Sequence, residues 1–277
     1  MRQIILADNA GFCFGVSRAV GKAFELGSPQ KKIFTFGELI HNKDVVKKLA
    51  EQNIMAIDDG QLPQITAHDT VLIRSHGVGR EKLAQISELS EHVVNLTCPY
   101  VLNIQKRVSE YHKKGYKIII LGDKDHPEVI GINGWCDNQA LISKGGVVDF
   151  EVSGKVCVVS QTTEMQANWI RLISDLAGKA NEICAFNTIC TATELRQSAT
   201  EKLAKEVDAM VVIGGKHSSN TAKLYEICKQ HCPHAYFVEN ALELKTYREE
   251  LTNYEKIGVT AGASTPDWII KEAMELL

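Results

Sequence analysis

The feature that most constrains this chain of 277 residues is a spacing that occurs three times. Cys13, Cys98 and Cys190 each precede an amphipathic segment and then an apolar run that ends in a glycine 24 residues after the cysteine. A polar side chain follows 28 residues after each cysteine. In order, these side chains are His41, His126 and Ser218. A spacing kept three times indicates an internal repeat, so we expect three similar units whose cysteines meet at a shared centre.

The intervals between the cysteines indicate the size of the units. They are 85 and 92 residues, which favours three units of about 90 residues each. We place these units at residues 1–96, 97–186 and 187–277, with the first strand, Ile4–Ala7, in the first unit. Strand and helix patterns alternate almost throughout, which is typical of α/β folds. The other strands that we expect are Ile33–Phe36, Val71–Arg74, Val93–Leu96, Lys117–Leu121, Lys155–Val159, Glu182–Phe186, Ala209–Ile213 and Lys256–Thr260. The sequence therefore predicts three small, pseudo-repeated α/β units with mainly parallel sheets around a central site.

Composition and charge exclude several classes of function. A net charge of −3 argues against a broad surface for nucleic acid or for a membrane. The apolar runs have the length of strands, far short of a membrane span. A strand follows Met1 directly, without a signal or transit pattern, which predicts a cytoplasmic protein. In a reducing compartment, eight cysteines indicate metal binding or catalysis more than disulfides.

A second loop in each unit adds polar side chains to the expected pocket. These loops contain His76, Thr162 and Ser264, which follow the three cysteines by 63, 64 and 74 residues. Ligands bind at the carboxyl ends of parallel strands, where loops lead into helices. The repeat thus predicts one pocket lined by three cysteines, three inner polar groups and three outer ones.

Three converging thiolates suit a soft metal or an iron–sulfur cluster with one iron left open for a substrate. The alternative is three buried thiols that never meet, because free cysteine is often a small core residue. Cys184 competes with Cys190 for the third position, but no helix begins at Cys184 and the residue 24 positions later is Asp208, which lies before a strand. Cys228 and Cys232, with two nearby histidines, indicate either a surface zinc site or packed side chains.

Other loops carry groups for acid–base chemistry and for anion binding. Glu128 stands in the first turn of a helix after a strand, where it either donates a proton or only stabilises the helix dipole. Ser218, Ser219 and Asn220 follow two glycines at a helix start, which is a suitable arrangement for a phosphate. The last helix offers a similar start, at which we expect Thr265 to be the N-cap. Capping alone explains either helix start equally well, but two of them near His41 and His76 favour one polyanion.

Many ordered motifs resemble those of 4-hydroxy-3-methylbut-2-enyl diphosphate reductases, the LytB-type iron–sulfur reductases of the non-mevalonate isoprenoid pathway. The motifs that carry the resemblance span the whole chain. They are Gly11-Phe12-Cys13-Phe14-Gly15-Val16 with Arg18-Ala19, Ile40-His41-Asn42, Arg74-Ser75-His76-Gly77-Val78, Thr97-Cys98-Pro99, His126-Pro127-Glu128-Val129, Gln161-Thr162-Thr163, Asn187-Thr188-Ile189-Cys190, Ser218-Ser219-Asn220-Thr221 and Ala263-Ser264-Thr265-Pro266-Asp267.

The resemblance implies a [4Fe-4S] cluster held by Cys13, Cys98 and Cys190 at the centre of the fold. It implies reductive dehydroxylation of (E)-4-hydroxy-3-methylbut-2-enyl diphosphate to isopentenyl and dimethylallyl diphosphates, with Glu128 as the proton source. Thr162 would hold the hydroxyl end of this small-molecule substrate, and His126 would lie near the diphosphate. The residues implied for the diphosphate grip are His41, His76, Ser218, Ser219, Asn220 and Ser264. A ferredoxin or a flavodoxin would supply electrons, because no flavin or nicotinamide fingerprint is visible.

Two other classes of function remain open from the sequence. An iron–sulfur hydro-lyase would use the same open iron but would turn over without a reductant. A metal or phosphate sensor built on structural zinc would contain zinc and no sulfide.

Overall fold

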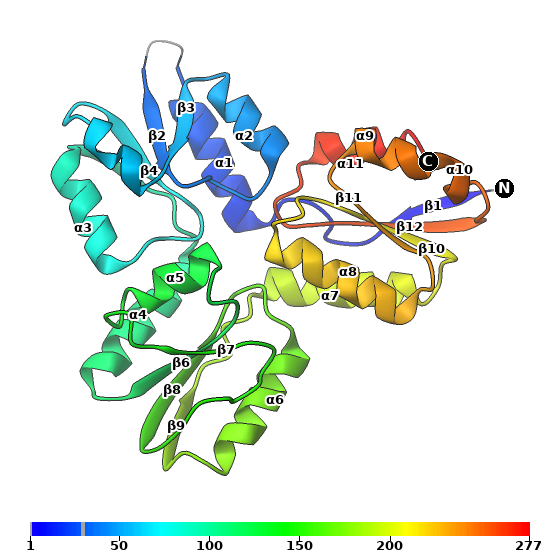
Figure 1. Ribbon diagram of the computed structural model, residues 1–277. Coiled ribbons are helices and arrows are strands. Elements are labelled where there is room, and N and C mark those ends of the chain that lie inside the picture. Colours follow the sequence, from blue (N-terminus) through cyan, green and yellow to red (C-terminus); the bar gives the residue numbers. More distant parts are fainter. Residues whose placement is uncertain (1, 29–30) are drawn as a thin grey trace. The chain divides into compact units, whose positions relative to one another are not determined.

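The computed structural model describes residues 2–28 and 31–277. The chain divides into two compact units. Unit 1 consists of residues 1–17, 41–45 and 191–277, and unit 2 consists of residues 18–40 and 46–190. Helices α1 (Phe14–Leu26) and α2 (Lys43–Ala50) each cross a boundary between the two (Figure 1). Among the described helices, none combines the length and the apolar character that a membrane crossing requires.

Unit 1 is built on a four-stranded parallel sheet in the order β1-β12-β10-β11. Its strands are β1 (Gln3–Leu6), β10 (Ala209–Ile213), β11 (Ala235–Val238) and β12 (Lys256–Ala261). Its helices are α7 (Thr191–Ala204), α8 (Ser219–His231), α9 (Ala241–Leu244), α10 (Arg248–Leu251) and α11 (Asp267–Met274), with a short 3-10 helix η2 (Lys245–Tyr247).

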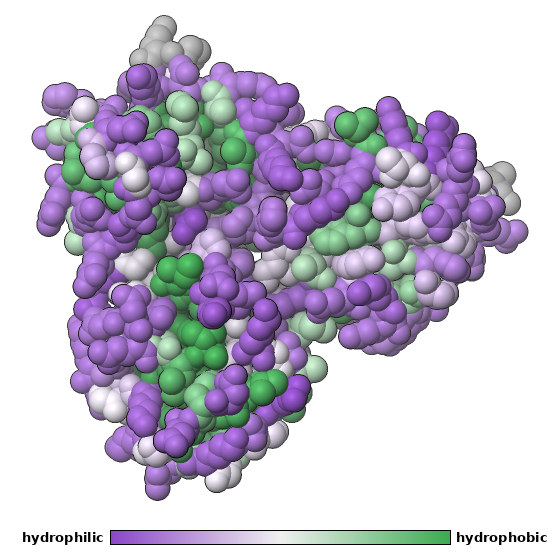
Figure 2. All heavy atoms as spheres, viewed as in Figure 1, coloured by the Kyte–Doolittle hydropathy of each residue, from purple (hydrophilic) through white to green (hydrophobic). Residues whose placement is uncertain are grey.

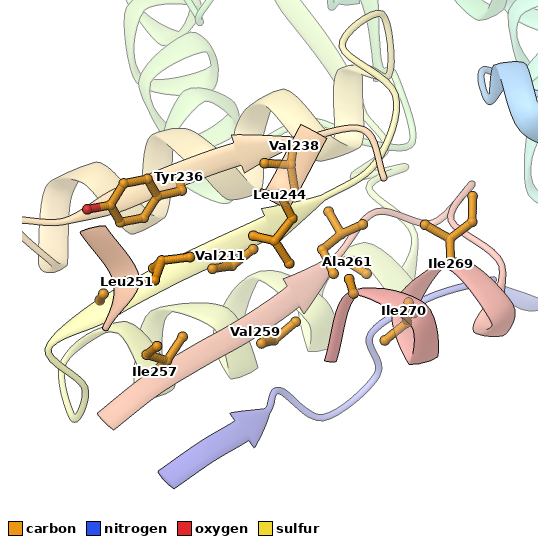
Figure 3. Close-up of a cluster of buried hydrophobic side chains, with 13 residues drawn as sticks. Val211, Tyr236, Val238, Leu244, Leu251, Ile257, Val259, Ala261, Ile269 and Ile270 are labelled. Carbon is orange, nitrogen blue, oxygen red and sulfur yellow. The ribbon is translucent and has the colours of Figure 1, made fainter. Parts of the chain in front are cut away.

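The two faces of this sheet bury separate cores. On one face, side chains such as Val211 of β10 and Val259 of β12 pack against α9 to α11 (Figure 3). Met210 and Val212, which point to the other face, pack with residues of α7 and α8. Because both faces are covered, β10 contains only apolar residues and every one of them is buried.

Unit 2 contains two further parallel sheets, in the orders β3-β2-β4-β5 and β7-β6-β8-β9. The strands of the first sheet are β2 (Ile33–Phe36), β3 (Ile54–Ile57), β4 (Thr70–Ile73) and β5 (His92–Asn95). Those of the second are β6 (Lys117–Leu121), β7 (Leu141–Ser143), β8 (Lys155–Ser160) and β9 (Glu182–Ala185). The accompanying helices are η1 (Asp59–Gln64), α3 (Arg80–Leu89), α4 (Pro99–Lys113), α5 (Pro127–Asn133) and α6 (Gln166–Ala177).

The predicted repeat is confirmed at the level of topology. Each sheet has an edge strand that precedes one of the three cysteines, and this strand always pairs with the strand that leads into the second polar loop. One assignment was wrong: β1 does not join the first sheet but pairs with β12, with Gln3 opposite Lys256. The division at 96/97 and 186/187 stays a prediction. Figure 2 shows mostly hydrophilic side chains on the visible face, with hydrophobic ones gathered around α5 and β7 of unit 2.

Candidate active site

The three repeat cysteines occupy the same position in the secondary structure. Cys13, Cys98 and Cys190 are half-buried, and each stands directly before a helix, α1, α4 or α7 respectively. Cys184, the rival to Cys190, lies inside strand β9 instead. The structure thus gives Cys190, and not Cys184, the strand-to-helix position that the other two cysteines share.

Four further cysteines are core residues. Cys136, Cys157, Cys228 and Cys232 are buried among apolar side chains. Burial raises the pKa of the Cys136 thiol to about 11 and that of Cys157 and of Cys228 to about 12. A thiol that keeps its proton in an apolar core is a poor metal ligand. The packed interpretation of Cys228 and Cys232 is therefore favoured over a surface zinc site.

Each repeat cysteine is tied by its backbone to a second polar loop. The N–H of Cys98 donates to Ser75 O at 2.9 Å, and the N–H of Cys190 donates to Thr162 O at 3.1 Å. The N–H of Cys13 donates to Ala263 O at 3.3 Å, within unit 1. These acceptors are Thr162 itself and the residues just before His76 and Ser264. Three equivalent bonds thus bring each predicted outer polar group next to one cysteine loop.

A local turn shapes the approach to the two cysteines of unit 2. The Thr97 N–H donates to Asn95 Oδ1 at 3.0 Å, and the Ile189 N–H donates to Asn187 Oδ1 at 3.2 Å. This is the same side-chain-to-backbone turn, placed at the same offset from each cysteine. Thr188 was not predicted as a site residue. Its hydroxyl donates to Ser160 O of β8 and accepts the Ser160 N–H, both at 2.7 Å. Its place in the cysteine motif was the available signal.

Glu128 and Thr162 form a buried acid–hydroxyl pair in unit 2. The Thr162 N–H donates to Glu128 Oε1 at 2.6 Å, and the Thr162 hydroxyl donates to Oε2 at 2.8 Å. Glu128 is only 3% exposed. Because both oxygens are held, the carboxyl group has one orientation. A glutamate that only stabilises a helix dipole does not require hydrogen bonds to both of its oxygens. The geometry therefore favours a role in the site.

The two predicted histidines of unit 2 lie together. The rings of His76 and His126 meet edge to face with centroids 5.4 Å apart. His126 is the N-cap of α5, and its Nδ1 accepts the Glu128 N–H at 3.1 Å. Since Nδ1 acts as an acceptor, the proton of a neutral His126 ring lies on Nε2, which can donate to a ligand.

Two glycines let the His76 loop approach α5 closely. A Cβ atom on Gly134 would lie 2.6 Å from the Gly79 Cα atom, so no side chain fits there. The Trp135 indole N–H, just beyond α5, donates to Val78 O at 3.0 Å. These contacts fix the loop that carries His76 against α5, which has the predicted acid in its first turn.

Unit 1 contains the remaining predicted residues: Cys13, His41, Ser218, Ser219, Asn220 and Ser264. Ser218 is the N-cap of α8 and accepts the Thr221 N–H. The Ser264 hydroxyl donates to His41 O at 3.2 Å, which joins two loops that are far apart in sequence. The Asn220 side chain is 3% exposed, and neither of its amide atoms has a hydrogen-bond partner among the described residues. A buried amide without partners is costly and indicates a ligand at this position.

One capping prediction was wrong. Pro266, and not Thr265, is the N-cap of α11. The Thr265 hydroxyl instead donates to Ile213 O at 3.0 Å, at the carboxyl end of β10. Thr265 therefore ties the last loop to the sheet.

Comparison with known proteins agrees with this arrangement. A curated 4-hydroxy-3-methylbut-2-enyl diphosphate reductase from Clostridium perfringens (strain 13 / Type A) is 52% identical over 274 residues, which cover 99% of this chain and 97% of that relative. A solved structure of (E)-4-hydroxy-3-methyl-but-2-enyl diphosphate reductase, the terminal enzyme of the non-mevalonate pathway, is 38% identical with a TM-score of 0.68 and covers 100% of this chain and 99% of that one.

A solved E-1-hydroxy-2-methyl-but-2-enyl-4-diphosphate reductase from Plasmodium falciparum is 27% identical with a TM-score of 0.88. It covers 100% of this chain, which in turn spans 88% of it. The model of the LytB protein family matches residues 4–277, almost the full length. The chain therefore belongs to the LytB family.

Proposed function

We propose that the chain is a 4-hydroxy-3-methylbut-2-enyl diphosphate reductase, the activity for which its relatives are named. The reaction takes up two electrons and two protons, breaks the C–O bond of the allylic alcohol and releases water. Its products are isopentenyl and dimethylallyl diphosphates. Beyond family membership, the observation that carries the proposal is the buried Glu128–Thr162 pair, whose backbone is bonded directly to the Cys190 loop.

The residues fit an iron–sulfur cluster with three protein ligands. Cys13, Cys98 and Cys190 would hold it, because these half-buried thiols stand at equivalent helix starts while four other cysteines are sealed in cores. Three thiolates satisfy three irons of a [4Fe-4S] cubane and leave the fourth without a protein ligand. When bound, such a cluster supplies electrons and Lewis acidity. The donor set thus matches a reductive reaction better than a structural zinc.

Glu128 is the proposed proton source at the hydroxyl end of the substrate. The Thr162 hydroxyl donates to the Glu128 carboxyl group, and the Thr162 carbonyl accepts the Cys190 N–H. This hydroxyl can therefore orient the leaving oxygen and relay the proton. Their burial excludes water, which strengthens each hydrogen bond in the site.

The diphosphate would be gripped by neutral donors more than by fixed positive charge. His41, Ser218, Ser219, Asn220 and Ser264 in unit 1 would share this role with His76 and His126 in unit 2. The Asn220 amide would gain the partner that it lacks among the described residues, and the N-terminus of α8 adds a positive dipole end. Such a site binds an anion in a protein with a net charge of −3.

A separate one-electron donor, a ferredoxin or a flavodoxin, completes the proposal. The test is anaerobic purification followed by iron and acid-labile sulfide analysis, then turnover with substrate and reduced methyl viologen. We expect a brown protein that forms both products only when the reductant is present. Turnover without a reductant would instead identify a hydro-lyase, and a colourless protein with stoichiometric zinc would contradict the cluster.

A further inference from the structure

An arginine holds the backbone immediately before Cys98. Nη2 of Arg18, on α1, donates to Leu96 O at 3.0 Å and to Thr97 O at 2.6 Å. The bonds link α1 to a loop 78 and 79 residues away in sequence. Leu96 and Thr97 occupy the two positions before the cysteine, so the guanidinium fixes the direction in which the chain enters it.

A second arginine does the same for Cys13 in unit 1. Nη2 of Arg196, on α7, donates to Gly11 O at 2.7 Å, and Nη1 donates to Ala192 O of its own helix at 3.3 Å. Gly11 stands two residues before Cys13, which is the position of the Leu96 carbonyl relative to Cys98. Arg196 is 2% exposed, and hydrogen bonds shielded from water are stronger than exposed ones. The equal register shows that the contact belongs to the repeat.

The third helix of the set also directs an arginine to a cysteine loop, through a different contact. The Arg107 guanidinium carbon, on α4, lies 4.3 Å from the centre of the Phe186 ring. Phe186 follows β9 directly and opens the loop that leads to Cys190. A cation over an aromatic face restrains the ring more weakly than two bonds to carbonyls restrain a backbone.

These contacts follow a single order. Helices α1, α4 and α7 each begin after one cysteine, and each sends an arginine to the loop before the next: Cys98, Cys190 and, at the return, Cys13. We infer that Arg18, Arg107 and Arg196 are positioning residues that set the three cysteine loops to receive the cluster. This inference rests on the proposed function, because it assigns the loops to a metal centre.

Arginine suits this role better than lysine. Its planar fork offers five N–H donors in fixed directions, whereas a lysine ammonium is a mobile point charge. Peptide carbonyls in a loop have no ladder partners of their own, so a bond from a guanidinium both satisfies and orients them. Loss of the bonds leaves the loop more conformations in which its cysteine faces away from the metal.

The test compares holoenzyme variants by the rate at which a ferrous chelator removes iron, without oxygen and well below the melting temperature. We expect Arg18→Gln to lose iron about tenfold faster than wild type, since charge-assisted bonds are lost. Arg18→Lys should fall between the two, and Arg107→Gln should show a smaller increase. The matched control is Arg171→Gln, an exposed arginine on α6, which should behave as wild type.

Arg196→Lys tests the buried position without removing its charge. Arg196→Gln is avoided, because loss of a buried, hydrogen-bonded charge destabilises the fold itself. We expect faster iron release from Arg196→Lys at a melting temperature close to that of the wild type. If the variants melt lower but release iron at the wild-type rate, the arginines are merely structural and the inference is wrong. Wild-type protein that holds iron but does not turn over would refute the proposed function alone.

Discussion

Replacement of Glu128 by glutamine separates its chemical role from its structural one. The carboxyl group accepts two bonds, one from a backbone N–H that cannot reverse and one from a hydroxyl that can rotate. In Glu128→Gln, the amide oxygen can keep the backbone bond, and the NH2 group can donate to the rotated Thr162 hydroxyl. The pair therefore stays joined while the transferable proton is lost.

The structure predicts very different magnitudes for the two effects. As the acid, Glu128 is protonated and uncharged, so the exchange for glutamine replaces neutral hydrogen bonds, which contribute about 0.5–1.5 kcal/mol each, with other neutral ones. The free energy of unfolding should thus change by about 1 kcal/mol or less, a shift of roughly 2–4 °C in melting temperature. A lost general acid slows a reaction by about 10²–10⁴-fold, or about 3–5 kcal/mol at 1.36 kcal/mol per tenfold.

The assay measures kcat per cluster with reduced methyl viologen, alongside iron content, inorganic diphosphate affinity and melting temperature. Glu88→Gln, at an exposed position of α3, is the matched control. We expect only kcat to fall in Glu128→Gln. A variant that retains more than about a tenth of the wild-type kcat would refute Glu128 as the proton donor, and a loss of iron in proportion to activity would assign it a structural role instead.

Three further predictions address the cysteines and the anion site. Cys190→Ser should lose iron on anaerobic purification while Cys184→Ser keeps it, and equal losses would reverse the assignment between the two. Asn220→Leu should weaken the binding of inorganic diphosphate in calorimetry. The melting temperature should stay unchanged or rise, because the substitution removes a buried amide without partners among the described residues. A lower melting temperature with intact binding would contradict this prediction. Burial raises the pKa of Cys157 and of Cys228 in the folded state. The contribution of these protonated thiols to stability is complete below the ordinary thiol pKa near 9 and is lost as pH rises toward about 12. The melting temperature should therefore fall across that pH range.

The sequence predicted the elements that carry strong periodicity. Strands such as Ile33–Phe36, Lys117–Leu121 and Ala209–Ile213 have the predicted bounds, because they are apolar and bounded by polar residues or glycine. The same edge strand was missed in all three sheets: β3, β7 and β11. These strands have three or four residues, and Met55 of β3 is exposed. Short, half-exposed edges leave little periodic signal.

The residues of the candidate site also fall into those that the sequence could indicate and those that it could not. The acid role of Glu128 came from the resemblance to the reductases. Spacing indicated Cys98, Cys190 and His126, because a repeat marks residue types at fixed offsets. It could not identify Arg18 or Arg196, because their partners are backbone carbonyls, and any residue supplies a carbonyl. Spacing also could not predict which group the Thr265 hydroxyl bonds to, so the capping role predicted for Thr265 was wrong.

The pairing of β1 with β12 agrees with the repeat if each repeat unit is taken to include the strand before its cysteine. Cys98 follows β5 and Cys190 follows β9, and each of these strands completes the sheet of the residues that precede it. Among the described residues no strand follows β12, so the third sheet would lack its edge if the pattern were strictly linear. β1, the strand before Cys13, takes that place. The Arg196 contact to Gly11 repeats the closure in the side chains, since α7 holds the loop between β1 and Cys13 as α1 holds the loop between β5 and Cys98. A three-ligand centre requires equivalent loops, and a repeat that closes on its own first strand supplies the third loop with the same supports as the other two.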